Sequence, residues 1–280
     1  FNSLQSSKIH VIMLGILWDK MKKRHPFNKL TAMTVKKLSK PGKYGVRFIC
    51  SPNEEVGSTG FHQIFEQYSK DSIAVLGLEP SLNSGDVISK RKGNRWYDIK
   101  VKGRQVHSGR DHVKGRNACG ELAIHLAKLH EMTDYSKNIT VNIGKIEGGK
   151  NHNVVSDHAY GQLEVRYDCH ESQQYIVKKI EQSLEKSFIS SEETGDKCTL
   201  SYSVVDNCPP MSEAKGAGLL FEEYQKFIKS IENKTISKKC VGGAADANHF
   251  GRANLAMLDG LGPIGGGMHT KDEFNKFLIL

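Results

Sequence analysis

Residues 46–60 read VRFICSPNEEVGSTG, an apolar run that is followed at once by two adjacent glutamates and then by small residues. The run VRFIC is typical of a buried β-strand, and the residues GFHQIFEQYSK at 60–70 are typical of a helix with one apolar face. The apolar run SIAVLGL at 72–78 predicts a second strand. A strand, a loop, a helix and a strand in this order indicate an α/β sheet.

Carboxylates follow both predicted strands, because Glu54 and Glu55 come after the first and Glu79 comes directly after the second. Ligands of open α/β sheets bind beyond the carboxyl ends of the strands, so we expect these glutamates to lie at one edge of the sheet. Adjacent residues can point in different directions, which lets one carboxylate bind a metal while its neighbour stays free as a base. This arrangement suits metal-assisted hydrolysis, whereas a pair of surface charges is the alternative for the glutamates taken alone.

Two glycine-rich loops near the end of the sequence add further polar residues. The loop GLGPIGGGMHTKDEF at 260–274 contains His269, and the loop VGGAADANHF at 241–250 contains Asp246. A lone histidine is usually structural, but glycine-rich backbone beside it leaves room for a ligand. The pattern therefore favours a ligand site around His269.

A different pattern occupies residues 91–205. The stretch RWYDIKVKGR at 95–104 alternates as a strand does, NACGELAIHLAKLHEM at 117–132 is amphipathic as a helix is, and strand, strand, helix and strand patterns follow. The order β-α-β-β-α-β is that of a ferredoxin-like fold, and its compact length suits an inserted domain. We therefore expect residues 1–90 and 206–280 to form the two parts of an α/β domain, with the ferredoxin-like domain between them.

Composition narrows the class of protein. The 280-residue chain has 40 Lys and Arg against 31 Asp and Glu, a formal net charge of +9, but the basic residues are scattered and no nucleic-acid-binding motif stands out. No apolar run is long enough to cross a membrane, and the 6 cysteines form no CxxC pair. We expect no nucleic-acid or membrane partner, free thiols and a cytoplasmic protein. Secretion or a periplasmic location is the alternative, since the sequence begins with Phe1 and not with Met.

Five segments together resemble the di-zinc metallohydrolases that include glutamate carboxypeptidases, aminoacylases, acetylornithine deacetylase and succinyl-diaminopimelate desuccinylase. They occur in the order that the family has: SPNEEVGSTG, VHSGRDHVKGRNA, IEGGKNHNVVSDHAYGQLEVRY, GGAADAN and DGLGPIGGGMHTKDEF. The resemblance extends from about Tyr44 to Phe274 and is greatest to the glutamate carboxypeptidase branch. It implies a zinc-exopeptidase-like α/β catalytic domain with an inserted ferredoxin-like lid and dimerisation domain.

The resemblance implies roles for the carboxylates and the histidine. Glu54 would be the general base that activates water, Glu55 and His269 would bind one zinc ion, and Glu79 would bind the other. Asp19, in GILWDKMKK, would bridge the two ions, although it lies 36 residues before Glu55, about one more than in the family, and lacks the flanking glycines. Cobalt or manganese is the alternative to zinc, because mixed His and carboxylate ligands suit these metals too.

The resemblance also implies roles in substrate binding. His107, in VHSGR, would reach across a homodimer to the neighbouring active site and stabilise the oxyanion. Asn153 and Arg166 would hold the carboxylate of the substrate, a task that suits the planar fork of arginine; a surface salt bridge is the alternative for Arg166. Gly243, in GGAADAN, would contact the substrate, a small peptide or an N-acyl amino acid whose amide bond lies next to a free carboxylate.

The sequence departs from the family pattern before Asp19. The family carries a His-x-Asp metal motif on an earlier strand, whereas His10 is followed by Val11 and Ile12. Ala245 also stands where the family usually has Ser or Thr. We therefore expect a chain truncated at its N-terminus, and two hypotheses follow: a metal-dependent exopeptidase or amidohydrolase, and an inactive relative that dimerises or binds other molecules.

Overall fold

The computed structural model describes residues 10–16, 45–51, 54, 57–58, 60–214, 216–253, 255–266 and 274–276. The chain forms two compact units, which we call the inserted unit, Gly93–Cys208, and the flanking unit, Phe1–Lys92 with Pro209–Leu280. The inserted unit thus begins two residues later and ends three residues later than the domain expected from the sequence pattern.

A parallel sheet forms the centre of the flanking unit. Its strands are β1 (His10–Ile16), β2 (Gly45–Ser51), β3 (Ser72–Gly77) and β10 (Ala256–Leu258). They lie in the order β10-β3-β1-β2, and every neighbouring pair is parallel. The α/β sheet predicted from the sequence is confirmed, but β1, which lies between β3 and β2, is not among the strands that the sequence analysis predicts.

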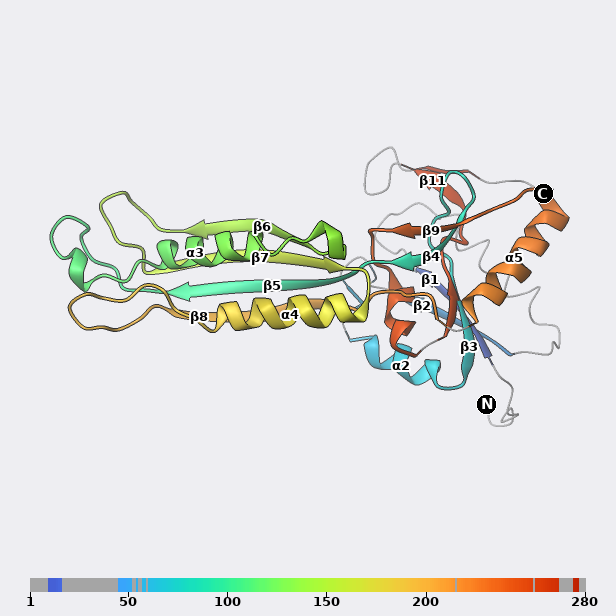
Figure 1. The fold of residues 1–280 in the computed structure, drawn as a ribbon, viewed down its shortest axis with the longest axis horizontal. Helices are drawn as coiled ribbons and strands as arrows, with labels where there is room; N and C mark the ends of the chain where they lie inside the picture. Colours follow the sequence, from blue (N-terminus) through green and yellow to red (C-terminus); the bar gives the residue numbers. More distant parts are fainter. Residues whose placement is uncertain are drawn as a thin grey trace. The chain divides into compact units, whose positions relative to one another are not determined.

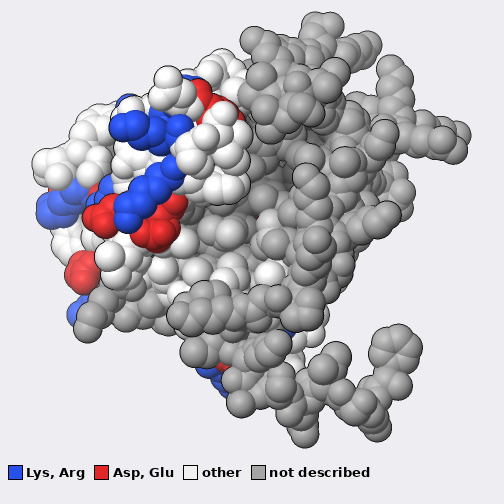
Figure 2. All heavy atoms as spheres, turned by 90° about the vertical axis from the view of Figure 1, so that its right-hand side faces the viewer, with Lys and Arg blue, Asp and Glu red and all other residues white. Residues whose placement is uncertain are grey.

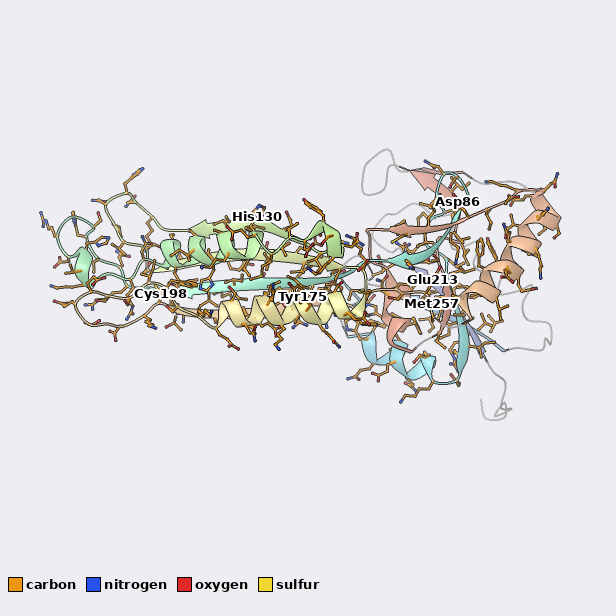
Figure 3. All side chains as sticks on the ribbon, viewed as in Figure 1. Asp86, His130, Tyr175, Cys198, Glu213 and Met257 are labelled. Carbon is orange, nitrogen blue, oxygen red and sulfur yellow. The ribbon has the colours of Figure 1, made fainter. Side chains whose placement is uncertain are left out.

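Helices cover both faces of this sheet, which is why its strands are apolar on both sides. On one face, α2 (His62–Ser69) and the 3₁₀-helix η4 (Asp246–Ala253) pack on a core that includes Phe65, Val75, Phe250 and Met257 (Figures 1 and 3). On the other face, α5 (Ala217–Glu232) packs on Leu258 and its neighbours. Successive residues of β10 therefore belong to different cores.

Short strands complete the flanking unit. Strands β4 (Val87–Arg91) and β9 (Lys238–Val241) form a parallel pair, and β11 (Ile264–Gly266) and β12 (Phe274–Lys276) form an antiparallel pair. Basic and acidic side chains lie side by side on the face shown in Figure 2. Ion pairs such as Lys238–Glu213 and Lys239–Asp86 balance part of the basic charge.

The inserted unit is an antiparallel sheet with two helices on one face (Figure 1). Its elements follow the chain order β5 (Gly93–Lys102), α3 (Ala118–His130), β6 (Thr140–Gly148), β7 (His158–Tyr167), α4 (His170–Leu184) and β8 (Thr199–Cys208). The strand order is β6-β7-β5-β8, with every neighbouring pair antiparallel. The predicted ferredoxin-like split pattern is confirmed.

Every second residue of β5 and β7 contributes to the core of this unit. Ile99, Val101, Leu163 and Val165 point toward the helices and are at most 2% exposed, while polar residues alternate with them on the open face. Where the chain enters and leaves the unit, the Tyr167 hydroxyl lies 3.0 Å from the carbonyl oxygen of Asn94 and 3.1 Å from that of Cys208. Among the described residues, no helix is long and apolar enough to cross a membrane.

Candidate functional site

Four carboxylates gather near the carboxyl ends of the parallel strands in the flanking unit. Glu54, Glu79 and Asp259 follow β2, β3 and β10, and Asp246 is the first residue of η4. Burial raises the pKa of Glu79 well above its ordinary value, and the charges of Asp259, Glu54 and Asp246 raise it further. We call these four residues the carboxylate cluster. Carboxylates that affect one another's pKa lie in the same region of the unit, so the cluster is the candidate functional site.

Arg91, the last residue of β4, supplies a positive charge to the cluster. Its Nε donates a hydrogen bond to Asp259 Oδ2 at 2.7 Å, and its Nη1 donates to the carbonyl oxygen of Gly243 at 3.0 Å. The side chains of Arg91 and Asp259 are 9% and 0% exposed, so this ion pair is buried. The charge of Arg91 lowers the pKa of Glu79 and so opposes the effect of the carboxylates.

Asp259 links this arginine to Glu79. Its Oδ1 accepts hydrogen bonds from the backbone N–H groups of Gly260 at 2.7 Å and Glu79 at 3.4 Å. The carboxylate passes directly over β3, since a Cβ built on Gly77 would lie 2.1 Å from Asp259 Oδ1. A glycine at position 77 is therefore what allows Asp259 to reach the strand end that carries Glu79.

Asp246 has a more hydroxyl-rich environment than Glu79. Its Oδ1 accepts a hydrogen bond from Ser58 Oγ at 2.5 Å. Burial raises the pKa of Asp246, whereas hydrogen bonds from Ser58 and Ser51 act in the opposite direction. These hydroxyls connect the cluster to the loop that carries Glu54.

Three of the proposed metal ligands, Asp19, Glu55 and His269, lie outside the described residues. Within the described part of the chain, no three His, Cys, Asp or Glu side chains form a metal-binding group. The fourth proposed ligand, Glu79, suits a metal, because it is a half-buried carboxylate whose pKa is raised by the charges of other carboxylates. Divalent metal ions bind such oxygen donors and would offset the repulsion between them.

His107 and Asn153 lie together in the inserted unit. Their segments touch through a bridge between His107 and Val154 and through a 3.0 Å hydrogen bond from Ser108 N to the carbonyl oxygen of Asn153. Both residues are exposed. His107 Nδ1 accepts a hydrogen bond from Gly109 N at 3.2 Å, which leaves Nε2 to carry the ring proton as a donor.

Arg166 lies at the other end of the same sheet. It pairs with Asn94 in the register of β5 and β7, whereas Lys102, close to His107 in sequence, pairs with His158. The eight-residue separation along the strands corresponds to roughly 27 Å. The half-buried guanidinium of Arg166 donates to Glu164 Oε1 at 2.7 Å. One inserted unit therefore keeps Arg166 apart from His107 and Asn153.

Sequence reasoning missed Asp259, a member of the carboxylate cluster, and Arg91, its ion-pair partner. Asp259 follows the apolar run LAML directly, so the rule that placed Glu79 at a strand end could have identified it. Arg91 carries no comparable signal, because its partner lies 168 residues away. Gly243, expected to contact substrate, is exposed, and its carbonyl oxygen accepts the hydrogen bond from Arg91.

Comparison with known proteins bears on both units. Residues 89–192 match the family described as the peptidase dimerisation domain of M20 peptidases. The chain is 22% identical over 235 residues to carboxypeptidase G2 of Pseudomonas sp. (strain RS-16), a match that covers 81% of this chain and 55% of that protein. It is 28% identical over 176 residues to a p-aminobenzoyl-glutamate hydrolase homolog from Haemophilus influenzae, a match that covers 61% of this chain and 38% of that protein.

A solved structure extends the likeness over the fold. The YXEP protein of Bacillus subtilis, described as a dinuclear metal-binding peptidase of the M20 family, superimposes with a TM-score of 0.65 at 14% identity. The match covers 97% of this chain and 77% of that one. The chain spans only about half or less of the length of the carboxypeptidase and the hydrolase homolog that it matches in sequence. The match of residues 89–192 to the peptidase dimerisation domain, the sequence likeness to the two hydrolases and the shared fold together show that this chain is similar to the M20 family of peptidases.

Proposed function

We propose that this protein is a metal-dependent exopeptidase or amidohydrolase that cleaves an amide bond next to a free carboxylate. The observation that carries the proposal is the carboxylate cluster, in which the charges of Glu54, Asp246 and Asp259 raise the pKa of the half-buried Glu79 near the strand ends. The names of the relatives, a carboxypeptidase and a hydrolase of a glutamate amide, support a substrate of this kind. None of the described residues or relatives favours the alternative of an inactive binding protein.

Zinc is the proposed metal, with Glu55 and His269 holding one ion, Glu79 the other and Asp19 bridging the two. When bound, the metal would polarise the scissile carbonyl and lower the pKa of a water molecule. Glu54 would accept a proton from the attacking water and pass it to the leaving nitrogen. The proximity of Glu54 to Glu79, seen in the effect of its charge on the pKa of Glu79, supports this role.

The substrate is held by residues of two copies of the chain. His107 of one copy donates a hydrogen bond from Nε2 to the developing oxyanion in the other copy, and Asn153 beside it helps to hold the substrate carboxylate. Arg166 and Gly243 of the copy that carries Glu54 contact the substrate, with Arg166 binding its carboxylate. The separation of Arg166 from His107 along one sheet supports this sharing of the site between copies.

A homodimer through the inserted unit is part of the proposal. Strand β6 is an edge of its sheet and is exposed from Gly144 to Gly148, so its backbone groups can pair with a second strand. Beside it lies an apolar groove of about 490 Å³ between β6 and α3. Side chains that line the groove include Leu122, Leu126, Ile143 and Ile146.

Replacing Ile146 by Arg is expected to convert the dimer to a monomer. The Ile146 side chain is 63% exposed on the β6 edge, and an arginine there would place two like charges across a two-fold contact. Sedimentation velocity measures the change. Val205→Arg is the matched control, because Val205 is 51% exposed on the opposite edge strand and should leave the dimer intact. An Ile146→Arg protein that remains dimeric would assign the interface to another surface.

The proposed activity is tested with N-acyl amino acids and small peptides. The chain reloaded with Zn²⁺ is expected to release an amino acid from substrates with a free carboxylate and to leave the corresponding carboxamides intact. Removal of metal with a chelator should abolish turnover, and Zn²⁺ should restore it. Equal hydrolysis with and without chelator would contradict the proposal.

We place the enzyme in the cytoplasm, a location with which six free cysteines agree.

A further inference from the structure

Both ends of the loop that carries Glu54 meet at one carboxylate. Ser51 is the last residue of β2, and Ser58 lies four positions after Glu54. Ser58 Oγ donates to Asp246 Oδ1 at 2.5 Å, the Ser51 hydroxyl also hydrogen-bonds to Asp246, and the two serine oxygens are 3.0 Å apart. Ser51, Ser58 and Asp246 are 1%, 0% and 6% exposed, so water does not compete for these hydrogen bonds.

The 3₁₀-helix η4, which begins at Asp246, is also connected to this loop through His62. The His249 ring stacks on the His62 ring with centroids 4.2 Å apart, and His62 Nε2 lies 3.1 Å from the carbonyl oxygen of Gly57. Residues three apart lie on one side of a 3₁₀-helix, so Asp246 and His249 approach the loop from the same face of η4. One direct contact, from Asp246, and one indirect contact, from His249 through His62, therefore join η4 to the loop.

The described residues at the end of this loop have tightly turned backbone, which needs support from outside. Gly57, Ser58 and Gly60 have φ angles of +84°, +48° and +89°. A positive φ at a non-glycine residue such as Ser58 is unfavourable and persists when surrounding contacts enforce it. Ser58 donates its hydroxyl to Asp246 at this strained position, so Asp246 is well placed to enforce the turn.

We propose that Asp246 is a positioning residue for Glu54: it fastens both ends of the Glu54 loop to η4 and so fixes the direction of the base. The catalytic role that we assign to Asp246 rests on the proposed function. The attachment of the Glu54 loop to η4 does not depend on that function. A buried carboxylate is expensive unless it is hydrogen-bonded, and an apolar side chain would fill the same space more favourably. The presence of an aspartate with two serine partners therefore points to the hydrogen bonds and not to packing.

Hydrogen exchange on the full chain tests the fastening without any assay of activity. Asp246→Ala is expected to raise exchange in a peptide spanning residues 51–60 about tenfold relative to peptides from β3 and β10. Asp246→Asn, which retains an acceptor oxygen, should stay close to the original protein, and Ser51→Ala with Ser58→Ala should resemble Asp246→Ala. Asp206→Ala is the control: Asp206 is also buried and accepts a 2.5 Å hydrogen bond, from Asn94, but lies in the inserted unit.

The outcomes separate fastening from general stability. No change in the 51–60 peptide, or an equal rise throughout the flanking unit, would overturn the proposal, since Asp246 would then be an ordinary core residue. Kinetics add a second readout: in Asp246→Ala, kcat should fall about 100-fold with little change in KM, and Asp246→Asn should recover most of it. A looser loop with unchanged kcat would also overturn the proposal. An inactive parent protein would contradict the proposed function and leave the exchange experiment to decide the fastening.

Discussion

Replacing Glu54 by Gln is expected to lower kcat by about 100- to 10,000-fold, the range that a positioned general base contributes. The substitution keeps the shape of the side chain and removes its ability to accept and return a proton. Because Glu54 is half-buried and its loop is held at Ser51 and Ser58, a glutamine should occupy the same position. The loss should therefore appear in kcat and much less in KM.

Metal binding should survive this substitution. The negative charge of Glu54 raises the pKa of Glu79, so a neutral glutamine would let that pKa fall toward its ordinary value. A lower pKa leaves more of Glu79 ionised at neutral pH, and an ionised carboxylate is the form that binds a metal. Zinc per chain after dialysis, measured by elemental analysis, should equal that of the original protein.

A surface glutamate supplies the control for this experiment. Glu66 is exposed on α2, and Glu66→Gln changes the net charge by the same amount without touching the carboxylate cluster. That variant should keep the original kcat and zinc content. If Glu54→Gln retained full turnover, the base would have to be another residue; if it lost zinc together with activity, Glu54 would be a metal ligand.

The inserted unit could be predicted from the sequence because its signals are local. Its strands alternate between the helix-covered face and the open face, and its helices are amphipathic, so the periods of two and 3.6 residues are visible. Strand β1 has no such period, because a central parallel strand is apolar on both faces and reads as a short apolar run. The stretch HVIMLGI is an apolar run like those at 46–50 and 72–78, so the rule that predicts those two strands could have identified β1 as well.

The sequence predicts only those residues of the candidate site that closely follow a predicted strand. That rule brings Glu54 and Glu79 together, and the charge of Glu54 does raise the pKa of Glu79. The roles assigned to Asp19, Glu55 and His269 stay predictions, since these residues lie outside the described ranges. The contacts of Asp246 with Ser58 and of Arg91 with Asp259 join residues 188 and 168 positions apart, so no local pattern could indicate them.

Replacing Arg91 by Met is expected to reduce the free energy for opening the segment around Asp259 by about 3–5 kcal/mol, the usual effect of removing one partner of a buried ion pair. Methionine retains the aliphatic stem and leaves the Asp259 carboxylate, which is 0% exposed, without its cation. Two backbone N–H groups still donate to that carboxylate, from Gly260 and Glu79, but neither carries a full charge.

Hydrogen exchange in peptides covering residues 72–79 and 255–262 measures this loss in the full chain. A single unfolding midpoint would mix the flanking and inserted units, which are separate compact bodies, so a local probe is needed. Lys226→Met is the control, because Lys226 and Glu223 form an ion pair with side chains 71% and 73% exposed, and losing it should change stability by about 1 kcal/mol at most. Equal effects of the two substitutions would show that the buried pair contributes no more than a surface one.

A second substitution separates the uncompensated charge from lost packing. Adding Asp259→Asn to Arg91→Met removes the buried negative charge and retains an oxygen that can accept from Gly260 N, so part of the lost stability should return. The consequence for the site follows from the sign of the Arg91 charge, which lowers the pKa of Glu79. Without Arg91 that pKa rises further, less of Glu79 is ionised at neutral pH, and zinc should bind more weakly to Arg91→Met than to the double variant. In the double variant the neutral amide at position 259 no longer raises the pKa of Glu79. If the buried charge of Asp259 causes both the lost stability and the weaker zinc binding, zinc affinity should recover together with stability.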